Sequence, residues 1–207
     1  MAFGILVFPQ VEELDFVGPW EMATMWKMVA GGPDCVLVAE QMAPVVCAKG
    51  LSVNPQVAFA DCPPLDVLLV PGGQGTRTEV HNQVLLDFVA RQAPSCRAVL
   101  SVCTGAFVLH AAGLLAGRRA TTHWGALNRL RALGDVEVVE ERFTRDGPVW
   151  CAAGVSAGID LTLAYIADAA GDEAAGKVQL AAEYYPSDVR YGTAASHPQA
   201  PAYLRQG

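Results

Sequence analysis

The chain has 207 residues, of which 52% are hydrophobic, and this length and composition suit one compact α/β domain with a large buried core. Its formal net charge is -7 and its 14 Lys and Arg residues are scattered, so duplex nucleic acid and anionic membranes are poor candidates as partners. A small neutral molecule or a protein partner fits this composition better.

The apolar run at residues 3–8 predicts the first buried strand. It follows no basic segment and stops at Pro9, so it is too short for a signal peptide or a membrane span, and we expect a cytoplasmic protein. The six cysteines are widely spaced, with no C-x-x-C pair and no histidine at ligand spacing, which argues against a metal site. In a reducing compartment most of these thiols would be small buried hydrophobes.

Further apolar runs predict buried strands at residues 36–39, 67–70 and 98–102, and helical spacing of apolar residues predicts helices at 14–29, 78–92, 105–115, 124–133 and 159–169. This alternation indicates the α/β class and a flavodoxin-like, doubly wound, mostly parallel sheet between layers of helices. Residues 45–53 and 136–150 should form antiparallel hairpins added to the main sheet. We expect a single domain over residues 1–207, with residues from about 185 onward as a surface tail.

After the first strand, Asp15 lies in an apolar stretch at the carboxyl edge of the predicted sheet. One interpretation makes it the N-cap of the following helix, a common role for Asp. The other places its carboxyl group in a pocket as a general acid. Glu12 and Glu13 precede it in a more polar loop and are expected to be solvated.

A glycine-rich turn at residues 70–75 follows the strand at 67–70. The backbone N–H groups of Gly72 and Gly73 are candidates to face a pocket, although such turns are often only structural. The spacing does not match G-x-G-x-x-G and no acidic residue stands at the required distance, which disfavours nicotinamide cofactors.

Cys103 follows the strand at 98–102 directly and precedes a predicted helix, with Thr104 and Gly105 in the turn. Ligand sites of open α/β sheets lie outside the carboxyl ends of the strands, and a helix amino terminus favours a thiolate. The layout is that of a nucleophile elbow, with a buried structural cysteine as the alternative. If Asp15 reaches the same pocket, the two groups cannot cheaply both be charged, so one proton should be held or shared between them.

His123 stands at another predicted junction between a strand and a helix. It is a candidate second catalytic group. Because no acidic residue adjoins it to orient the ring, a structural role such as capping the helix is the competing interpretation.

Several blocks of the chain resemble the ThiJ/PfpI superfamily, whose members have a class I glutamine amidotransferase-like domain, and the similarity covers nearly everything from Phe3 to Tyr184. Within it, residues 14–19 joined to Cys103, and the block at 154–160, are similar to the isonitrile hydratase (isocyanide hydratase) branch. The blocks that carry the superfamily resemblance are residues 63–66, 70–73, 101–105, 112–117 and 120–124. Thr104 stands where several peptidase-like branches have His, which argues against a Cys-His peptidase. A branch of transcriptional regulators shares the blocks at 101–105 and 120–124 but continues into a helix-turn-helix domain. We expect this chain to be too short to contain that domain.

The resemblance implies roles for five residues: Cys103 as nucleophile, Asp15 as acid/base, Thr104 as support for the reacting centre, and Gly72 and Gly73 as pocket backbone. It also implies a homodimer and no cofactor. After Tyr184 the sequence differs from that of the isonitrile hydratase branch. This difference affects the identity of the expected substrate more than the expected chemistry.

The expected activity is that of a cysteine-dependent hydro-lyase that hydrates an isocyanide to an N-substituted formamide through a covalent thioimidate. The alternatives are a glyoxalase-like or deglycase-like enzyme acting on small carbonyl compounds, and a redox sensor in which Cys103 is oxidised without turnover.

Overall fold

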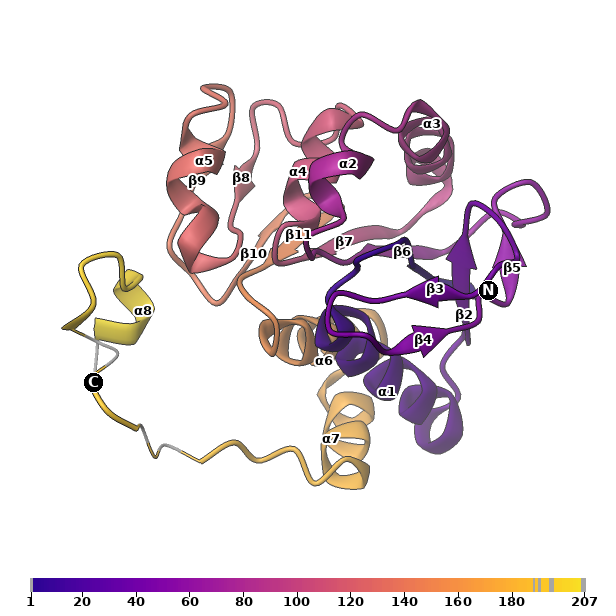
Figure 1. Ribbon diagram of the computed structural model, residues 1–207. Helices are drawn as coiled ribbons and strands as arrows, with labels where there is room; N and C mark the ends of the chain where they lie inside the picture. The colour runs from indigo at the N-terminus through magenta and orange to yellow at the C-terminus, as the bar shows by residue number, and fades with distance from the viewer. Residues whose placement is uncertain (1, 188, 190, 194–195, 206–207) are drawn as a thin grey trace.

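A seven-stranded sheet forms the centre of the protein in a computed structural model that describes residues 2–187, 189, 191–193 and 196–205 (Figure 1). The strand order is β10-β11-β7-β6-β1-β2-β5, and every neighbouring pair is parallel except β10 with β11. The predicted α/β class and mostly parallel sheet are therefore confirmed. The strands are β1 (Ala2–Leu6), β2 (Asp34–Ala39), β5 (Val57–Ala58), β6 (Val67–Val70), β7 (Ala98–Val102), β10 (Phe143–Asp146) and β11 (Val149–Ala152).

Helices cover both faces of this sheet (Figure 1). One face carries α1 (Glu13–Ala30), α6 (Ala157–Ala170) and α7 (Asp172–Ala181), which pack on one another. The other face carries α2 (Thr76–Glu79), α3 (Gln83–Gln92) and α4 (Gly105–Ala111). The short helix α5 (Leu127–Arg131) lies beyond the β10 side of the sheet, and a 3-10 turn, η2 (Trp124–Ala126), leads into it.

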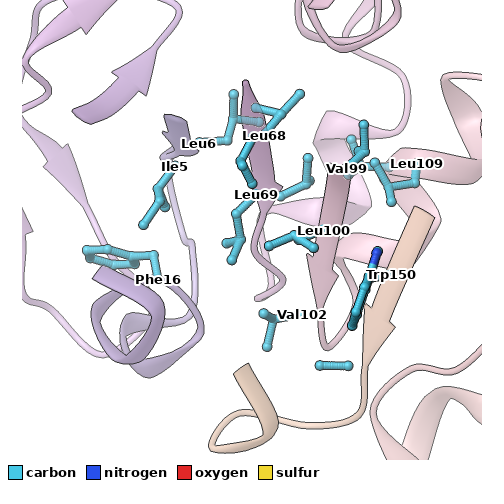
Figure 2. Close-up of a cluster of buried hydrophobic side chains, with 14 of the residues drawn as sticks. Ile5, Leu6, Phe16, Leu68, Leu69, Val99, Leu100, Val102, Leu109 and Trp150 are labelled. Carbon is cyan, nitrogen blue, oxygen red and sulfur yellow. The ribbon is translucent and has the colours of Figure 1, made fainter. Parts of the chain in front are cut away.

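The core is built from side chains of the central strands, which alternate between the two faces, and from the helix side chains that pack on them. Ile5, Leu69 and Leu100 are neighbours in register, and all three are fully buried. Figure 2 shows Ile5 on the side of Phe16 from α1, whereas Val99 lies with Leu109 of α4. Because helices bury both faces, both sets of alternating positions are apolar, which explains the continuous apolar runs in the sequence.

Three predicted helices are shorter or divided in the structure, and the one expected at 124–133 is the 3-10 turn η2 followed by α5, which ends at Arg131. The helix expected at 78–92 is two helices, α2 and α3, because the side chain of Asn82 accepts hydrogen bonds from the N–H groups of Val84 and Leu85 and caps α3. The helix expected at 105–115 ends with Ala111, and Gly113 follows with φ of 78°. Helix α7 was not predicted from the sequence.

The hairpin expected at residues 136–150 is partly wrong. Its second half is correct, because β10 pairs antiparallel with β11 around Gly147. However, β11 is an inner strand of the main sheet, parallel to β7, and β9 (Glu137–Val138) pairs with β8 (Arg119–Ala120) in a separate small sheet. The hairpin expected at 45–53 is confirmed as β3 (Val45–Val46) and β4 (Ser52–Val53), but it forms a separate two-stranded sheet and is not added to the main sheet.

The described part of the predicted tail returns to the body of the protein near η2. The ring of His197 meets that of Trp124 edge to face, with 5.2 Å between centroids, and the backbone N–H of Ala202 donates to Glu140 Oε2 at 2.8 Å. Ala202 begins the last helix, α8 (Ala202–Arg205). The expectation for residues 188, 190, 194–195 and 206–207 falls outside the described residues. No helix within the described ranges has the length and apolar character needed to cross a bilayer.

Candidate active site

The loops that follow four parallel strands, β1, β6, β7 and β11, meet at one edge of the sheet. They border a cleft of about 410 Å³. Its lining includes residues from each of these loops, the N-cap residue of η2 and a residue of α5, among them Glu12, Gly73, Cys103, Val155, His123 and Arg129. This is the edge where open α/β sheets bind ligands, as the sequence predicted.

Cys103 occupies a sharp turn between β7 and α4. Its φ is 57°, a left-handed conformation that costs a non-glycine residue free energy and that surrounding contacts must maintain. Its N–H donates to the carbonyl oxygen of Ala153 at 2.8 Å, and the hydroxyl of Thr122 donates to its carbonyl oxygen at 2.7 Å. A Cβ at Gly105 would lie 2.1 Å from the carbonyl oxygen of Val70, so the turn requires glycine there. The geometry is that of the predicted nucleophile elbow.

Asp15 lies within α1 and is fully buried. Its Oδ2 accepts a hydrogen bond from the N–H of Gly72 at 2.8 Å, while its buried Oδ1 has no hydrogen-bond partner among the described residues. Glu12, and not Asp15, holds the N-cap position of the helix. The N-cap interpretation of Asp15 is therefore wrong, and its carboxyl group faces the interior beside Cys103.

The carboxyl group of Asp15 and the thiol of Cys103 form a coupled, buried pair. Burial, opposed by the Gly72 N–H, raises the pKa of Asp15 to about 7. Burial, reinforced by the negative charge of Asp15, raises the pKa of the Cys103 thiol to about 12, although the N–H groups of Thr104 and Val155 lower it. Between about pH 7 and about pH 12 the pair therefore holds one proton, which is one of the states considered from the sequence.

The resting position of that proton differs from the sequence expectation. The helix amino terminus was expected to stabilise a thiolate. In the structure, burial and the neighbouring carboxylate outweigh the backbone N–H groups, so the thiol of Cys103 is the favoured form and Asp15 is the group that ionises first.

Thr104, Gly72 and Gly73 hold this pair in place. The hydroxyl of Thr104 accepts from the Gly73 N–H at 3.0 Å and from the Thr76 hydroxyl at 3.1 Å. A Cβ at Gly72 would lie 2.5 Å from the backbone nitrogen of Thr104 and 2.8 Å from Asp15 Oδ2. The N–H groups of both glycines therefore donate to protein side chains and not into the cleft. Gly73 lines the cleft, whereas Gly72 is not among its lining residues and contacts Asp15.

His123 lines the cleft and also has the structural role considered from the sequence. Its Nδ1 accepts a hydrogen bond from the N–H of Gly125 at 3.1 Å and caps η2. Burial lowers the pKa of the ring, which favours the neutral form. A Cβ at Gly154 would lie 2.4 Å from its Cδ2, so this glycine allows the ring to lie against the backbone.

Sequence reasoning missed several groups around the pair. Thr122 lies in the block at 120–124, and its local sequence does not predict its hydrogen bond to Cys103. Val155 lies in the block at 154–160, and its φ of 42° and its N–H near the Cys103 sulfur were not predicted either. Glu12 and Glu13 were expected to be solvated, yet each side chain is only 17% exposed, and both pair with Lys49. Lys49 lies in the β3–β4 turn, far along the chain from Glu12 and Glu13. Local sequence patterns do not report contacts between such distant residues.

The sheet is open and mostly parallel, and a cysteine occupies the elbow after its strand β7. These features define the class of flavodoxin-like α/β proteins that have a nucleophile elbow. The sequence profile of the DJ-1/PfpI family matches residues 3–168, and the chain belongs to this family.

The chain is similar to three relatives within or near this family. The chain is 42% identical to isonitrile hydratase of Pseudomonas putida over 189 residues, which cover 90% of this chain and 80% of that protein. The crystal structure of a ThiJ/PfpI family protein from Pseudomonas syringae superposes with a TM-score of 0.86 at 34% identity, over 99% of this chain and 82% of that one. The glutathione-independent glyoxalase DJR-1.2 of Caenorhabditis elegans is 30% identical over 58% of this chain and 69% of its own length.

Proposed function

We propose that the protein is an isonitrile hydratase in which Cys103 is the nucleophile and Asp15 the acid/base. The observation that carries the proposal is the pairing of a buried carboxyl group, with one oxygen unpartnered among the described residues, and the thiol of an elbow cysteine at a ligand cleft. The identity of 42% to an isonitrile hydratase supports it.

In the first step the pair supplies both a nucleophile and a proton. As the sulfur of Cys103 forms a bond to the terminal carbon of the isocyanide, the thiol proton passes to the Asp15 carboxylate. Asp15 then donates this proton to the same carbon. The product is a thioimidate, R–N=CH–S, in which the isocyanide carbon has gained one hydrogen and one sulfur, and Asp15 is again ionised.

Water completes the reaction. It adds to the thioimidate carbon, and Asp15 accepts one of its protons and passes it to the substrate nitrogen. The resulting carbon carries hydroxyl, sulfur and nitrogen. When the C–S bond breaks, the hydroxyl proton returns through Asp15 to Cys103 and an N-substituted formamide leaves. The net change is the addition of one water, and the enzyme regains its starting protonation.

Neighbouring groups assist by fixing this pair. Thr104 is held by three hydrogen bonds, including one to the carbonyl oxygen of Gly73 at 3.2 Å, and its N–H lies near the sulfur. The N–H groups of Thr104 and Val155 favour the thiolate that develops during attack. His123 borders the cleft beside the pair, and burial lowers the pKa of its ring and so favours the neutral form.

The test is conversion of phenyl isocyanide to formanilide by the purified protein, followed by proton NMR. We expect catalytic turnover in the wild type and none in Cys103→Ser. Methylglyoxal serves as the competing substrate, because glyoxalases belong to the same set of relatives. Turnover of methylglyoxal to lactate with no formanilide would replace the hydratase assignment by the glyoxalase alternative.

We also propose a homodimer. Leu14 of α1 and Leu51 of the β3–β4 hairpin are 38% and 51% exposed, and they border a shallow hollow with Val155, which also lines the active-site cleft. A second copy covering this hollow would bury apolar surface and close the cleft at one side. In sedimentation velocity experiments we expect a dimer that Leu51→Glu dissociates. Leu180→Glu, at a 65% exposed position of α7, is the control, and a monomeric wild type would contradict the proposal.

A further inference from the structure

Two arginines border the cleft that contains Cys103. Arg77 comes from α2 and Arg129 from α5, so two separate elements each contribute a guanidinium group to one site. Arg129 lies over the ring of Phe107, with 3.9 Å between its Cζ and the ring centroid, and this stacking holds the group in place while its N–H donors bond to none of the described residues.

These two positive charges lack carboxylate partners within the described part of the chain. Neither side chain forms an ion pair or a hydrogen bond there, whereas other arginines such as Arg131 and Arg142 do. Glu12 also borders the cleft, but its carboxylate accepts a hydrogen bond from Lys49 and is already paired. In a chain of net charge -7, the cleft is therefore a local exception to the overall charge.

The two guanidinium groups act on each other and on the reactive centre. Burial, and the charge of Arg77 after it, lower the pKa of Arg129, while Cys103 raises it. The two positive charges therefore repel one another, and Arg129 also lies close enough to Cys103 to interact with it electrostatically. An anion placed between them would relieve that repulsion and would use the donors that Phe107 leaves free.

We propose that Arg77 and Arg129 bind a carboxylate group carried by the substrate, so that the preferred substrate is an anionic isocyanide. This inference rests on the proposed function and specifies its substrate class. It also departs from the neutral substrate that the overall composition suggested. The carboxylate is held at the border of the cleft, and the isocyanide carbon at the other end of the molecule reaches the sulfur of Cys103.

The test compares 4-isocyanobenzoate with its methyl ester, which differ only in charge at the far end from the reacting carbon. We expect kcat/KM to be at least about tenfold higher for the carboxylate, and Arg77→Gln and Arg129→Gln each to lower that ratio roughly tenfold. Arg91→Gln is the matched control, because Arg91 also lies over a ring, that of Phe88, but outside the cleft. A wild-type ratio near one, or equal losses for both substrates, would overturn the inference.

A binding measurement separates this inference from the proposed reaction. Isothermal titration calorimetry with 4-formamidobenzoate and its methyl ester requires no turnover. Preferential binding of the carboxylate that both arginine variants abolish, without hydration of either isocyanide, would support the anion site and overturn the hydratase. Hydration of both isocyanides with equal binding of both formamides would support the hydratase and overturn the anion site.

Discussion

Replacing Asp15 by Asn should make the protein more stable and far less active at the same pH. The carboxyl group is fully buried, and its pKa is raised from 3.8 to about 7, chiefly by burial. A raised pKa means that the folded protein holds the carboxyl proton more tightly than the unfolded chain does. The charged form is therefore destabilising in the folded state, and this cost develops as the pH rises from about 4 to about 7 and is complete above that range.

The magnitude follows from the size of the shift. About three pKa units correspond to about 4 kcal/mol of unfolding free energy, which is an upper limit for the effect above pH 7. Asn carries no charge and its oxygen replaces Oδ2 as acceptor for the Gly72 N–H, but its NH₂ group has to find a partner. We therefore expect Asp15→Asn to be more stable than the wild type by about 1 to 4 kcal/mol at pH 8 and by much less at pH 4.

Urea unfolding at pH 4 and pH 8 measures this difference, with turnover recorded on the same samples. Turnover should fall by about 10² to 10⁴, or about 3 to 5 kcal/mol in barrier, because Asn cannot exchange a proton. Asp61→Asn, at an exposed position, is the control and should show no pH-dependent gain. An equal stability change at both pH values would refute the buried-charge argument. Turnover within a few-fold of wild type would refute the acid/base role.

Three further predictions concern the same centre. Cys103→Ala and Cys103→Ser should abolish turnover in folded protein, while Cys47→Ala should retain it; equal turnover of the serine variant would exclude thiol catalysis. The value of kcat/KM should rise with pH through about 7, where Asp15 ionises while Cys103 keeps its proton, and then stay level; a fall through this range would mean that the active form carries two protons. Gly72→Ala, whose Cβ would lie 2.8 Å from Asp15 Oδ2, should destabilise the protein by roughly 1 to 3 kcal/mol and impair turnover, whereas the open position Gly176 should accept Ala at no cost or with a small gain, as thermal unfolding will show.

The elbow was predictable from the sequence because each of its causes is local. A continuous apolar strand stops at Cys103, Gly105 follows at once and an amphipathic pattern begins. These features determine the turn and its place at the sheet edge. The turn at 70–75 was also predictable from its glycines, but the partners of the Gly72 and Gly73 N–H groups, which lie in distant segments, were not.

The surroundings of the elbow were not predictable in the same way, because they depend on contacts between distant segments. Both the N-cap and the pocket role of Asp15 are compatible with its local sequence, and the N-cap position of Glu12 together with the approach of Gly72 distinguishes them. The protonation of Cys103 depends on how deeply the sulfur is buried, which no local pattern reports. The inner position of β11 was missed because an antiparallel hairpin signal says nothing about the other neighbour of a strand.

Covalent attachment of the substrate to Cys103 is the central claim, and rapid-quench mass spectrometry tests it directly. Wild-type protein is mixed with phenyl isocyanide, quenched in acid at successive times and digested with protease. We expect the peptide containing Cys103 to gain the mass of one isocyanide before formanilide accumulates, and no such gain in Cys103→Ser. Formation of formanilide at full rate with no modified Cys103 peptide at any time would contradict the account.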